Sequence, residues 1–285
     1  MSGPHPTERL ASFPSSLRAR TRLLRLGPAP ALLVHPDAGP ANAAGEPLPP
    51  RPALLWLHGR TVSKELDSAR YQRLWRAGVA TAALDLPGHG ERLDPALQAP
   101  DALPDLLAAA LAELDAVVDA LRRTPGVDPE RLALGGMSAG GMIALRRLGD
   151  PHPFRAAIAE ATCGDFAAAA AGGGGPAWAR FEAARRRGLD PSARLDGWRP
   201  LPLLALHAEG DRVVPVAGIR RFVEALRARF AAAGADPELA RLVTWPETGA
   251  PEEHLGFGRK AGEARALVVD HLARHLDAAP VEPAA

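Results

Sequence analysis

The sequence has a single cysteine, Cys163, and no long uncharged hydrophobic run. One cysteine cannot form an intramolecular disulfide, and it excludes a metal cluster held by several cysteines. No stretch is long and apolar enough to cross a bilayer, and the N-terminus lacks the continuous apolar core of a signal peptide. These absences predict a cytoplasmic protein with no membrane partner.

An excess of charge of one sign is also lacking, because 34 basic residues face 33 acidic ones and the formal net charge is +1. Lysine occurs only at positions 64 and 260, and the arginines are dispersed among acidic residues. This balance gives no electrostatic reason to expect nucleic acid or an anionic membrane as a partner. With 47% hydrophobic and 24% charged residues, the composition is that of an ordinary globular protein.

What the sequence does contain is an alternation of short apolar runs with amphipathic stretches. A hairpin is expected at 20–35, and a loop rich in proline, glycine and alanine at 37–52. The apolar runs predict strands at 53–57, 79–84, 131–135, 156–161, 201–206 and 242–245. The amphipathic stretches predict helices at 64–77, 103–122, 140–148, 216–233 and 258–276. This order favours a single α/β domain with a mostly parallel, doubly wound sheet flanked by helices.

Residues 163–199 interrupt the alternation. They contain four consecutive glycines at 172–175, a helical pattern at 177–187 and several aromatic residues. A long insertion at the carboxyl edge of a sheet is typical of a lid, so we expect Trp178 and Phe181 to bind substrate. The alternative is a connector whose aromatic side chains only pack. The domain, 1–285, then has its core at about 20–277, with a disordered tail predicted at 278–285.

The most informative motif is Gly136-Met137-Ser138-Ala139-Gly140, directly after the apolar run at 131–135. A G-x-S-x-G between a strand and a helix is typical of a sharp turn that exposes a nucleophilic serine. The glycines are needed because a side chain at 136 or 140 would collide where the chain reverses. The alternative is a glycine-rich helix start with a capping serine.

A serine hydroxyl needs a general base, and the base needs an orienting carboxylate. Asp211 follows the predicted strand at 201–206, at the same sheet edge as Ser138, and is the candidate acid. It could instead be a turn or capping residue, and Asp165 and Glu160 are rival acids after the preceding strand. His254 follows the last predicted strand and completes the chain order Ser, Asp, His.

The developing oxyanion needs hydrogen-bond donors. We expect the backbone N–H groups of Ala139 and Arg60 to supply them, because His58-Gly59-Arg60 follows the strand at 53–57. The His58 side chain is expected to brace this loop rather than to titrate in catalysis. The Arg60 side chain is either a solvated charge or a contact for an anionic group of the substrate.

Together these residues resemble the α/β-hydrolase superfamily. The resemblance rests on Ser138, Asp211 and His254, on His58-Gly59, and on the run Asp85-Leu86-Pro87-Gly88-His89-Gly90-Glu91-Arg92, and it spans about 51–276. Within the superfamily the chain is similar to bacterial esterases of the dienelactone-hydrolase and prolyl-oligopeptidase-like group. Dienelactone hydrolases use a cysteine nucleophile, so their activity is not carried over to a serine. No N-terminal propeller is apparent, which argues against an oligopeptidase proper. The resemblance also implies that His89 shapes the rim of the site.

These observations predict a serine carboxylesterase acting on small-molecule esters through an acyl-enzyme, with no metal or organic cofactor. A peptidase or a thioesterase of the same fold is the alternative within enzymes. From another class, the chain could be a catalytically silent binding protein. The acyl group, the alcohol and the oligomeric state are not encoded in any motif that we can identify.

Overall fold

In the computed structural model, which describes residues 6–39, 47–171 and 176–281, eight strands form one sheet in the order β1-β2-β4-β3-β5-β6-β7-β8. The strands β1 and β2 form the predicted hairpin, and β2 pairs antiparallel with β4; all other neighbours are parallel. The mostly parallel sheet predicted from the sequence is therefore confirmed. The strands are β1 Thr21–Leu26, β2 Ala29–Val34, β3 Arg51–Leu57, β4 Ala80–Leu84, β5 Val127–Met137, β6 Phe154–Glu160, β7 Leu203–Ala208 and β8 Ala240–Trp245.

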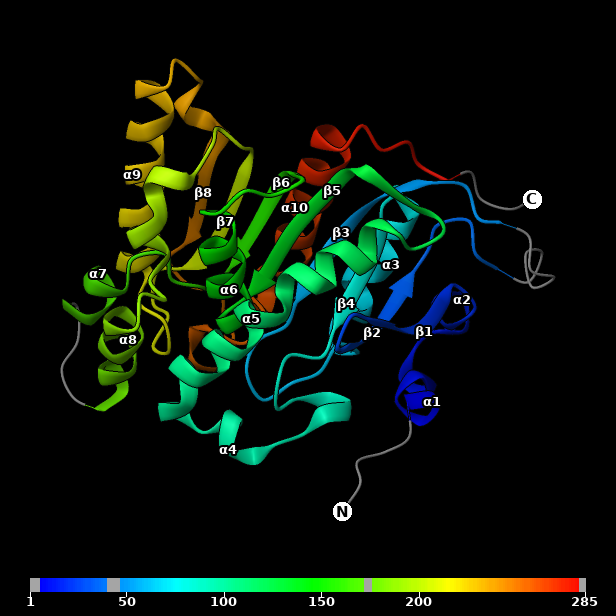
Figure 1. Cartoon of the computed structure of the whole chain (residues 1–285), viewed down its shortest axis with the longest axis horizontal. Coiled ribbons are helices and arrows are strands. Elements are labelled where there is room, and N and C mark those ends of the chain that lie inside the picture. The colour runs from blue at the N-terminus through cyan, green and yellow to red at the C-terminus, as the bar shows by residue number, and fades with distance from the viewer. Residues whose placement is uncertain (1–5, 40–46, 172–175, 282–285) are drawn as a thin grey trace.

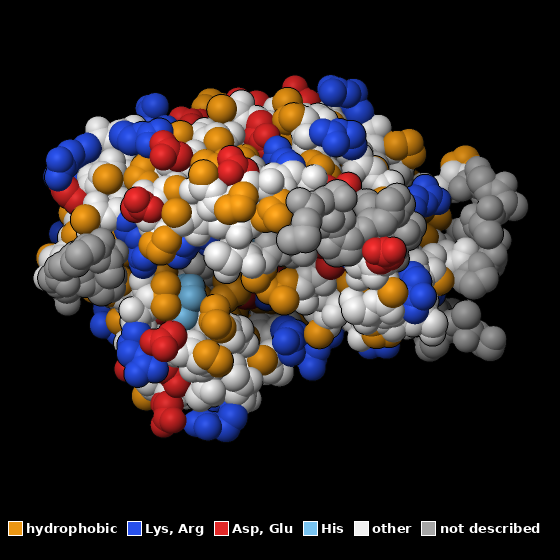
Figure 2. All heavy atoms as spheres, turned by 90° about the horizontal axis from the view of Figure 1, so that it is seen from below, with side chains coloured by type: hydrophobic (Ala, Val, Ile, Leu, Met, Phe, Trp, Pro, Cys, Tyr) orange, Lys and Arg blue, Asp and Glu red, His pale blue; other side chains and the backbone are white. Residues whose placement is uncertain are grey.

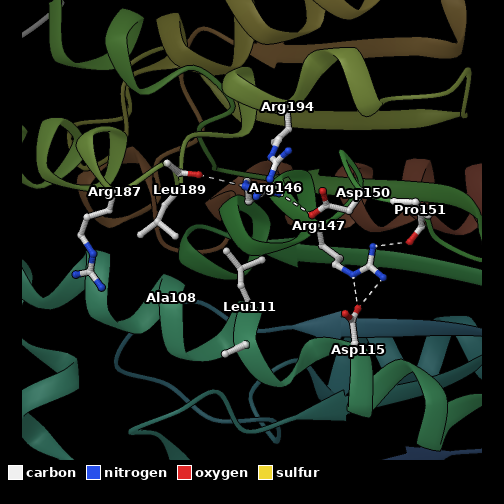
Figure 3. A pocket seen from close by; sticks show the side chains of 12 residues that line it. Ala108, Leu111, Asp115, Arg146, Arg147, Asp150, Pro151, Arg187, Leu189 and Arg194 are labelled. Atoms are coloured by element: carbon white, nitrogen blue, oxygen red, sulfur yellow. Dashed lines mark hydrogen bonds and ion pairs between the residues drawn. The ribbon is translucent and has the colours of Figure 1, made fainter.

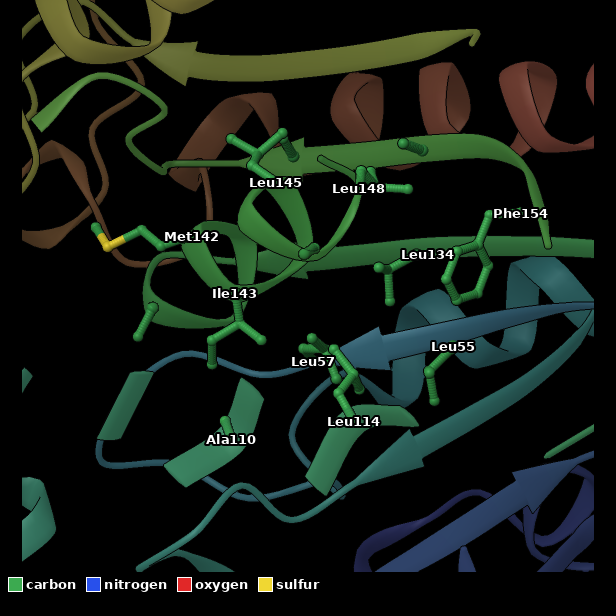
Figure 4. Close-up of a cluster of buried hydrophobic side chains, with 14 of the residues drawn as sticks. Leu55, Leu57, Ala110, Leu114, Leu134, Met142, Ile143, Leu145, Leu148 and Phe154 are labelled. Carbon is green, nitrogen blue, oxygen red and sulfur yellow. The ribbon is translucent and has the colours of Figure 1, made fainter. Parts of the chain in front are cut away.

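Helices cover both faces of this sheet (Figure 1). One buried cluster joins the sheet to α5, α6 and α9, and Figure 4 shows part of it, with Leu55 and Leu134 from the sheet and Ile143 from α6. A second cluster joins the opposite face to α3 and α10. The α-helices are α1 Pro6–Arg9, α2 Ser15–Arg18, α3 Ser68–Arg76, α4 Pro95–Gln98, α5 Leu103–Arg122, α6 Ala139–Arg147, α7 Phe166–Ala171, α8 Pro176–Arg186, α9 Val216–Ala232 and α10 Ala261–His275. Within the described residues, no helix is long and apolar enough to span a bilayer.

The helix predicted at 64–77 begins only at Ser68, so the prediction of a helical turn at 64–67 was wrong. Lys64 instead lies in a turn, where its backbone N–H and its Nζ both bind the Asp85 carboxylate, at 3.1 and 2.7 Å. Both partners are fully buried, and Glu91 accepts a further hydrogen bond from Nζ at 2.6 Å. A buried ammonium requires such partners, and this requirement outweighs the helical preference of the segment.

The insertion between β6 and β7 is built from α7, α8 and the 3₁₀ segment Pro191–Gly197. Its aromatic residues Phe166, Phe181 and Trp198 are fully buried and belong to the larger hydrophobic cluster. At the C-terminus, the Val281 N–H donates to the Arg76 carbonyl at 3.2 Å. The chain therefore contacts the domain as far as Val281, beyond the point where the predicted tail begins, and 282–285 lie outside the described residues.

Candidate active site

Ser138 stands at a sharp turn between β5 and α6, with φ 54° and ψ −120°. Such angles are strained for a residue with a side chain, so the surrounding structure must impose them. A Cβ at Gly136 would lie 2.4 Å from the Gly140 carbonyl carbon, and a Cβ at Gly140 would lie 2.2 Å from the Leu57 oxygen. Both positions therefore require glycine for the reason that the motif predicted.

Neighbouring strands hold this turn in place. The Ser138 N–H donates to the Glu160 carbonyl at 2.9 Å, and the Thr162 hydroxyl donates to the Ser138 carbonyl at 2.7 Å. Thr162 also faces Gly141, where a Cβ would lie 2.6 Å from it. Thr162 was not singled out from the sequence, because its contact depends on how β6 leaves the sheet beside β5.

The structure brings the three predicted triad residues together. The Ser138 Oγ lies 3.0 Å from the His254 Nε2, and the His254 Nδ1 lies 2.7 Å from an Asp211 oxygen. Asp211 and His254 are 7% and 6% exposed, whereas Ser138 is partly exposed. Of the three residues, the serine that must meet a substrate is therefore the accessible one. This arrangement lets the hydroxyl donate to Nε2 while the Nδ1–H donates to the carboxylate.

The loop after β7 fixes the Asp211 carboxylate. Its Oδ1 accepts the N–H groups of Val213 and Val214, at 2.8 and 2.7 Å, which leaves Oδ2 for His254. A second histidine, His207, lies 3.4 Å from the same Oδ2 and contacts the Val214 carbonyl through Nε2 at 3.0 Å. Burial lowers the pKa of His207, which favours its neutral form. The sequence gives no role to His207, because its contact with Asp211 depends on the conformation of the loop after β7.

His254 follows a strained loop. Glu252 and Glu253 have positive φ values of 55° and 52°, which residues other than glycine rarely adopt. The Glu253 carboxylate accepts the backbone N–H and the hydroxyl of Thr248, each at 2.6 Å, and the Gly249 N–H at 2.8 Å. These hydrogen bonds also lower the pKa of Glu253. Glu253 therefore holds the loop in the conformation that presents His254.

The loop after β3 lies beside the nucleophile, as the oxyanion hypothesis requires. A Cβ at Gly59 would lie 3.5 Å from the Cβ of Ser138, so the backbone there is close to the reacting hydroxyl. Ala139 is the first residue of α6, where backbone N–H groups lack partners within the helix. The donor roles of Arg60 and Ala139 stay predictions, and this placement is compatible with them.

Two buried histidines brace that loop. The Leu86 N–H donates to the His58 Nε2 at 3.1 Å, and the His58 Nδ1 lies 2.6 Å from the Gly59 carbonyl. The Thr61 N–H donates to the His89 Nε2 at 3.0 Å. Each histidine uses one ring nitrogen as an acceptor, which requires the neutral form, and burial lowers the pKa of His58 to about 4.

This pKa predicts a loss of stability in acid. Between pH 6.5 and about 4 the unfolded chain binds a proton at His58 that the folded chain does not, so the free energy of unfolding falls as the pH decreases. The difference between the two pKa values corresponds to up to about 3 kcal/mol at the acid end of this interval. Urea unfolding at pH 7 and at about pH 4.5 measures this change in the free energy of unfolding. A His58→Gln variant, which has no group to titrate there, should lose less stability over the same interval; equal losses would contradict the assignment.

The rival acids have other partners. Asp165 accepts the Ala168 N–H at 2.9 Å at the start of α7, and Glu160 forms a bidentate pair with Arg70, at 2.8 and 2.7 Å. Neither carboxylate has a hydrogen bond to His254 within the described residues. Asp211 is therefore the acid that the geometry favours.

A small pocket lies beside the serine. The residues that line this pocket are Arg60, Leu103, Ser138, Ala139, Met142, Arg180, Phe181, Val213 and Val214. Phe181 is among these lining residues, although it is fully buried and packs against Phe166, and its binding of substrate stays a prediction. The side chain of Trp178 lies outside the described part of the structure. Figure 2 shows the face of the molecule seen from below, where a histidine is visible in a hollow bordered by hydrophobic and basic side chains.

Solved structures with the same fold differ in length. The chain is 24% identical to the protein TT1662 from Thermus thermophilus, with a TM-score of 0.65 over 90% of this chain and 98% of the other. It is 18% identical to Est1E from Butyrivibrio proteoclasticus, in a complex with ferulic acid, with a TM-score of 0.63 over 90% and 99%. It is 17% identical to the acylaminoacyl peptidase of Pyrococcus horikoshii, with a TM-score of 0.67 over 93% of this chain but only 42% of the other. Comparison with curated protein sequences gives no match.

These likenesses establish the α/β-hydrolase fold that the sequence indicated. The sequence profile of the prolyl oligopeptidase family matches residues 68–277, a range that includes Ser138, Asp211 and His254. Because the match covers most of the chain, this protein belongs to the prolyl oligopeptidase family of serine hydrolases.

Proposed function

We propose that the protein is a serine esterase that hydrolyses carboxylic esters of small molecules. The observation that carries this proposal is the continuous hydrogen-bonded chain from Ser138 through His254 to Asp211, next to a pocket. In the first step the Ser138 Oγ attacks the ester carbonyl while the His254 Nε2 takes its proton. His254 then protonates the leaving alcohol, and an acyl-enzyme remains on Ser138. Water attacks this acyl-enzyme with His254 as the base, which releases the acid and restores the serine.

The other residues have defined parts in this proposal. Asp211 keeps the proton of His254 on Nδ1, so that Nε2 is free to accept the proton of the serine. The backbone N–H groups of Arg60 and Ala139 bind the oxyanion. The segment at 163–199 supplies one wall of the pocket through Arg180 and Phe181, which supports its proposed role as a substrate cover. Est1E binds ferulic acid, a carboxylic acid, which is compatible with an ester as the substrate class here.

A peptidase is the second candidate, because the family profile and the similarity to an acylaminoacyl peptidase both point to it. The same triad cleaves amides, but the poorer leaving group raises the barrier. A series of p-nitrophenyl esters from acetate to palmitate, measured beside p-nitroanilides of the same acids, separates the two. We expect turnover of the short and medium esters and little of the anilides; the opposite preference would favour the peptidase.

A fluorophosphonate probe distinguishes an enzyme from a catalytically silent binding protein. We expect the probe to label wild-type protein at Ser138, because only an activated serine attacks it readily. Mass spectrometry of the digested protein locates the adduct. A folded wild-type protein that stays unlabelled and inactive on every ester would contradict the esterase proposal.

A further inference from the structure

The pocket beside Ser138 is lined by two arginines whose guanidinium groups the proposed chemistry does not use. Arg60 comes from the loop after β3, and Arg180 comes from α8, about 120 residues later in the chain. Aliphatic and aromatic side chains form most of the remaining wall, including those of Met142 and Phe181. Two positive charges therefore stand in a largely apolar pocket, next to the proposed nucleophile.

The hydrogen bonds that hold these two arginines go to backbone carbonyl groups. The Arg60 Nη1 donates to the Gln98 carbonyl at 2.7 Å, and the Arg180 Nη2 donates to the Val213 carbonyl at 2.8 Å. The Arg180 guanidinium also lies 5.2 Å from the centre of the Phe181 ring. Over the ranges that the structure describes, neither arginine forms a salt bridge. Each guanidinium has five N–H donors, so most of them are left for a ligand.

Within the described part of the chain, no ion pair neutralises the charges of the two arginines. Burial lowers the pKa of both groups, and the charge of Arg60 lowers the pKa of Arg180 further. Asp211 acts in the opposite direction, but its oxygens are already occupied by His254 and by the backbone N–H groups of the loop. Arginine stays protonated at neutral pH in any case, so the pocket keeps two positive charges that repel each other.

Several other arginines of this protein are paired with carboxylates. In the groove of Figure 3, Arg147 binds Asp115 at 2.7 Å and Arg146 binds Asp150 at 2.8 Å. Arg187, in the same groove, binds Asp105 at 2.6 Å. In each of these pairs a carboxylate neutralises the charge of the arginine. Among the residues that the structure describes, the two arginines beside Ser138 have no such carboxylate partner.

We propose that Arg60 and Arg180 bind a carboxylate of the substrate, so that the preferred substrates are esters carrying a negative charge near the scissile bond. This inference rests on the ester hydrolysis proposed above and specifies its substrate class. A substrate carboxylate would accept charge-assisted hydrogen bonds from both guanidinium groups and end their mutual repulsion. The apolar wall would contact the carbon chain between the carboxylate and the ester.

Two esters that differ only at the far end of the acyl chain test the proposal. Mono-p-nitrophenyl adipate ends in a carboxylate, and p-nitrophenyl hexanoate has the same chain length and ends in a methyl group. We expect the wild-type kcat/KM to be roughly tenfold or more higher for the adipate at low salt, because hydrogen bonds to charged groups are the strong ones. This preference should shrink at about 0.5 M NaCl, because salt screens charges that are partly exposed.

Variants of Arg60 and Arg180 then test whether these residues cause the preference for the adipate. Arg180→Gln and Arg60→Gln should each lower the ratio of the two kcat/KM values by roughly tenfold, whereas Arg180→Lys, which keeps the charge, should retain part of it. Arg60→Gln keeps the backbone N–H proposed for the oxyanion. Arg185→Gln is the matched control, because Arg185 lies on the same helix and pairs with Glu182 at the surface. Its ratio should equal that of the wild type.

Each result decides a separate question. Wild-type turnover of both esters without a preference for the adipate would overturn the inference and leave the esterase proposal intact. An undiminished preference for the adipate in a folded variant of either arginine would also overturn the inference. Circular dichroism shows which variants fold. Failure to hydrolyse either ester, together with no fluorophosphonate adduct, would contradict ester hydrolysis itself, and the inferred substrate class would fall with it.

Discussion

Ser138→Ala is expected to lower kcat for ester hydrolysis by roughly 10³-fold or more, because the acyl-enzyme can no longer form. The fold should survive, since the hydroxyl is partly exposed and its hydrogen bond is to His254 rather than to a buried backbone group. The strained turn should persist, because the hydrogen bonds that hold it use the backbone of Ser138 and not its side chain. Initial rates on the best p-nitrophenyl ester, with circular dichroism of the same samples, measure both points.

Ser12→Ala is the matched control for this variant. Ser12 is exposed and its hydroxyl donates to the Arg9 carbonyl, so its removal should leave kcat unchanged. The fluorophosphonate adduct should form on Ser12→Ala and be absent from Ser138→Ala. If purified Ser138→Ala kept more than about a tenth of the wild-type kcat, Ser138 would not be the nucleophile.

Asp211→Asn is expected to lower kcat by up to roughly 10⁴-fold while preserving the shape of the loop. The amide oxygen can still accept the N–H groups of Val213 and Val214, as Oδ1 does now. The amide NH₂ would then face the His254 Nδ1, a position that only an acceptor fits when Nδ1 carries the proton. The imidazole would take the other tautomer, and its Nε2 could no longer accept the proton of Ser138.

Asp165→Asn is the comparison variant, because Asp165 is one of the two rival acids that the sequence offers. Its carboxylate accepts a single backbone N–H at the start of α7, so an amide oxygen replaces it with little change. We expect kcat within about threefold of the wild type, which corresponds to a change of less than 1 kcal/mol in the barrier. The opposite order of the two variants would move the acid to the end of β6.

Much of the fold follows from local pattern. The short apolar runs became the strands of a mostly parallel sheet because a strand buried on both faces has to be apolar throughout. The helix at 103–122 has the predicted bounds. The strand predicted at 131–135 extends from Val127 to Met137, because β5 lies between β3 and β6 and pairs with both. The additional residues are set by partners in the sheet, which periodicity does not report.

Errors occurred where a contact distant in sequence overrides local preference. The helix expected from Lys64 begins four residues later because Lys64 binds Asp85, which is 21 residues away. His207 was not among the candidate residues, yet it lies 3.4 Å from the Asp211 carboxylate. Arg180 belongs to a segment in which only the aromatic residues were singled out, and it lines the same pocket as Ser138.

The sequence by itself determined the residue types and the order of the catalytic candidates. Gly136 and Gly140 mark the turn, because steric exclusion acts between neighbouring segments and leaves a motif in the chain. The tertiary structure alone decided which carboxylate meets His254, which loop lies beside the serine and which arginines face the pocket. Hydrogen bonds and charges act over a few ångströms in space, and residues brought that close by the sheet can be more than a hundred positions apart, as Ser138 and His254 are.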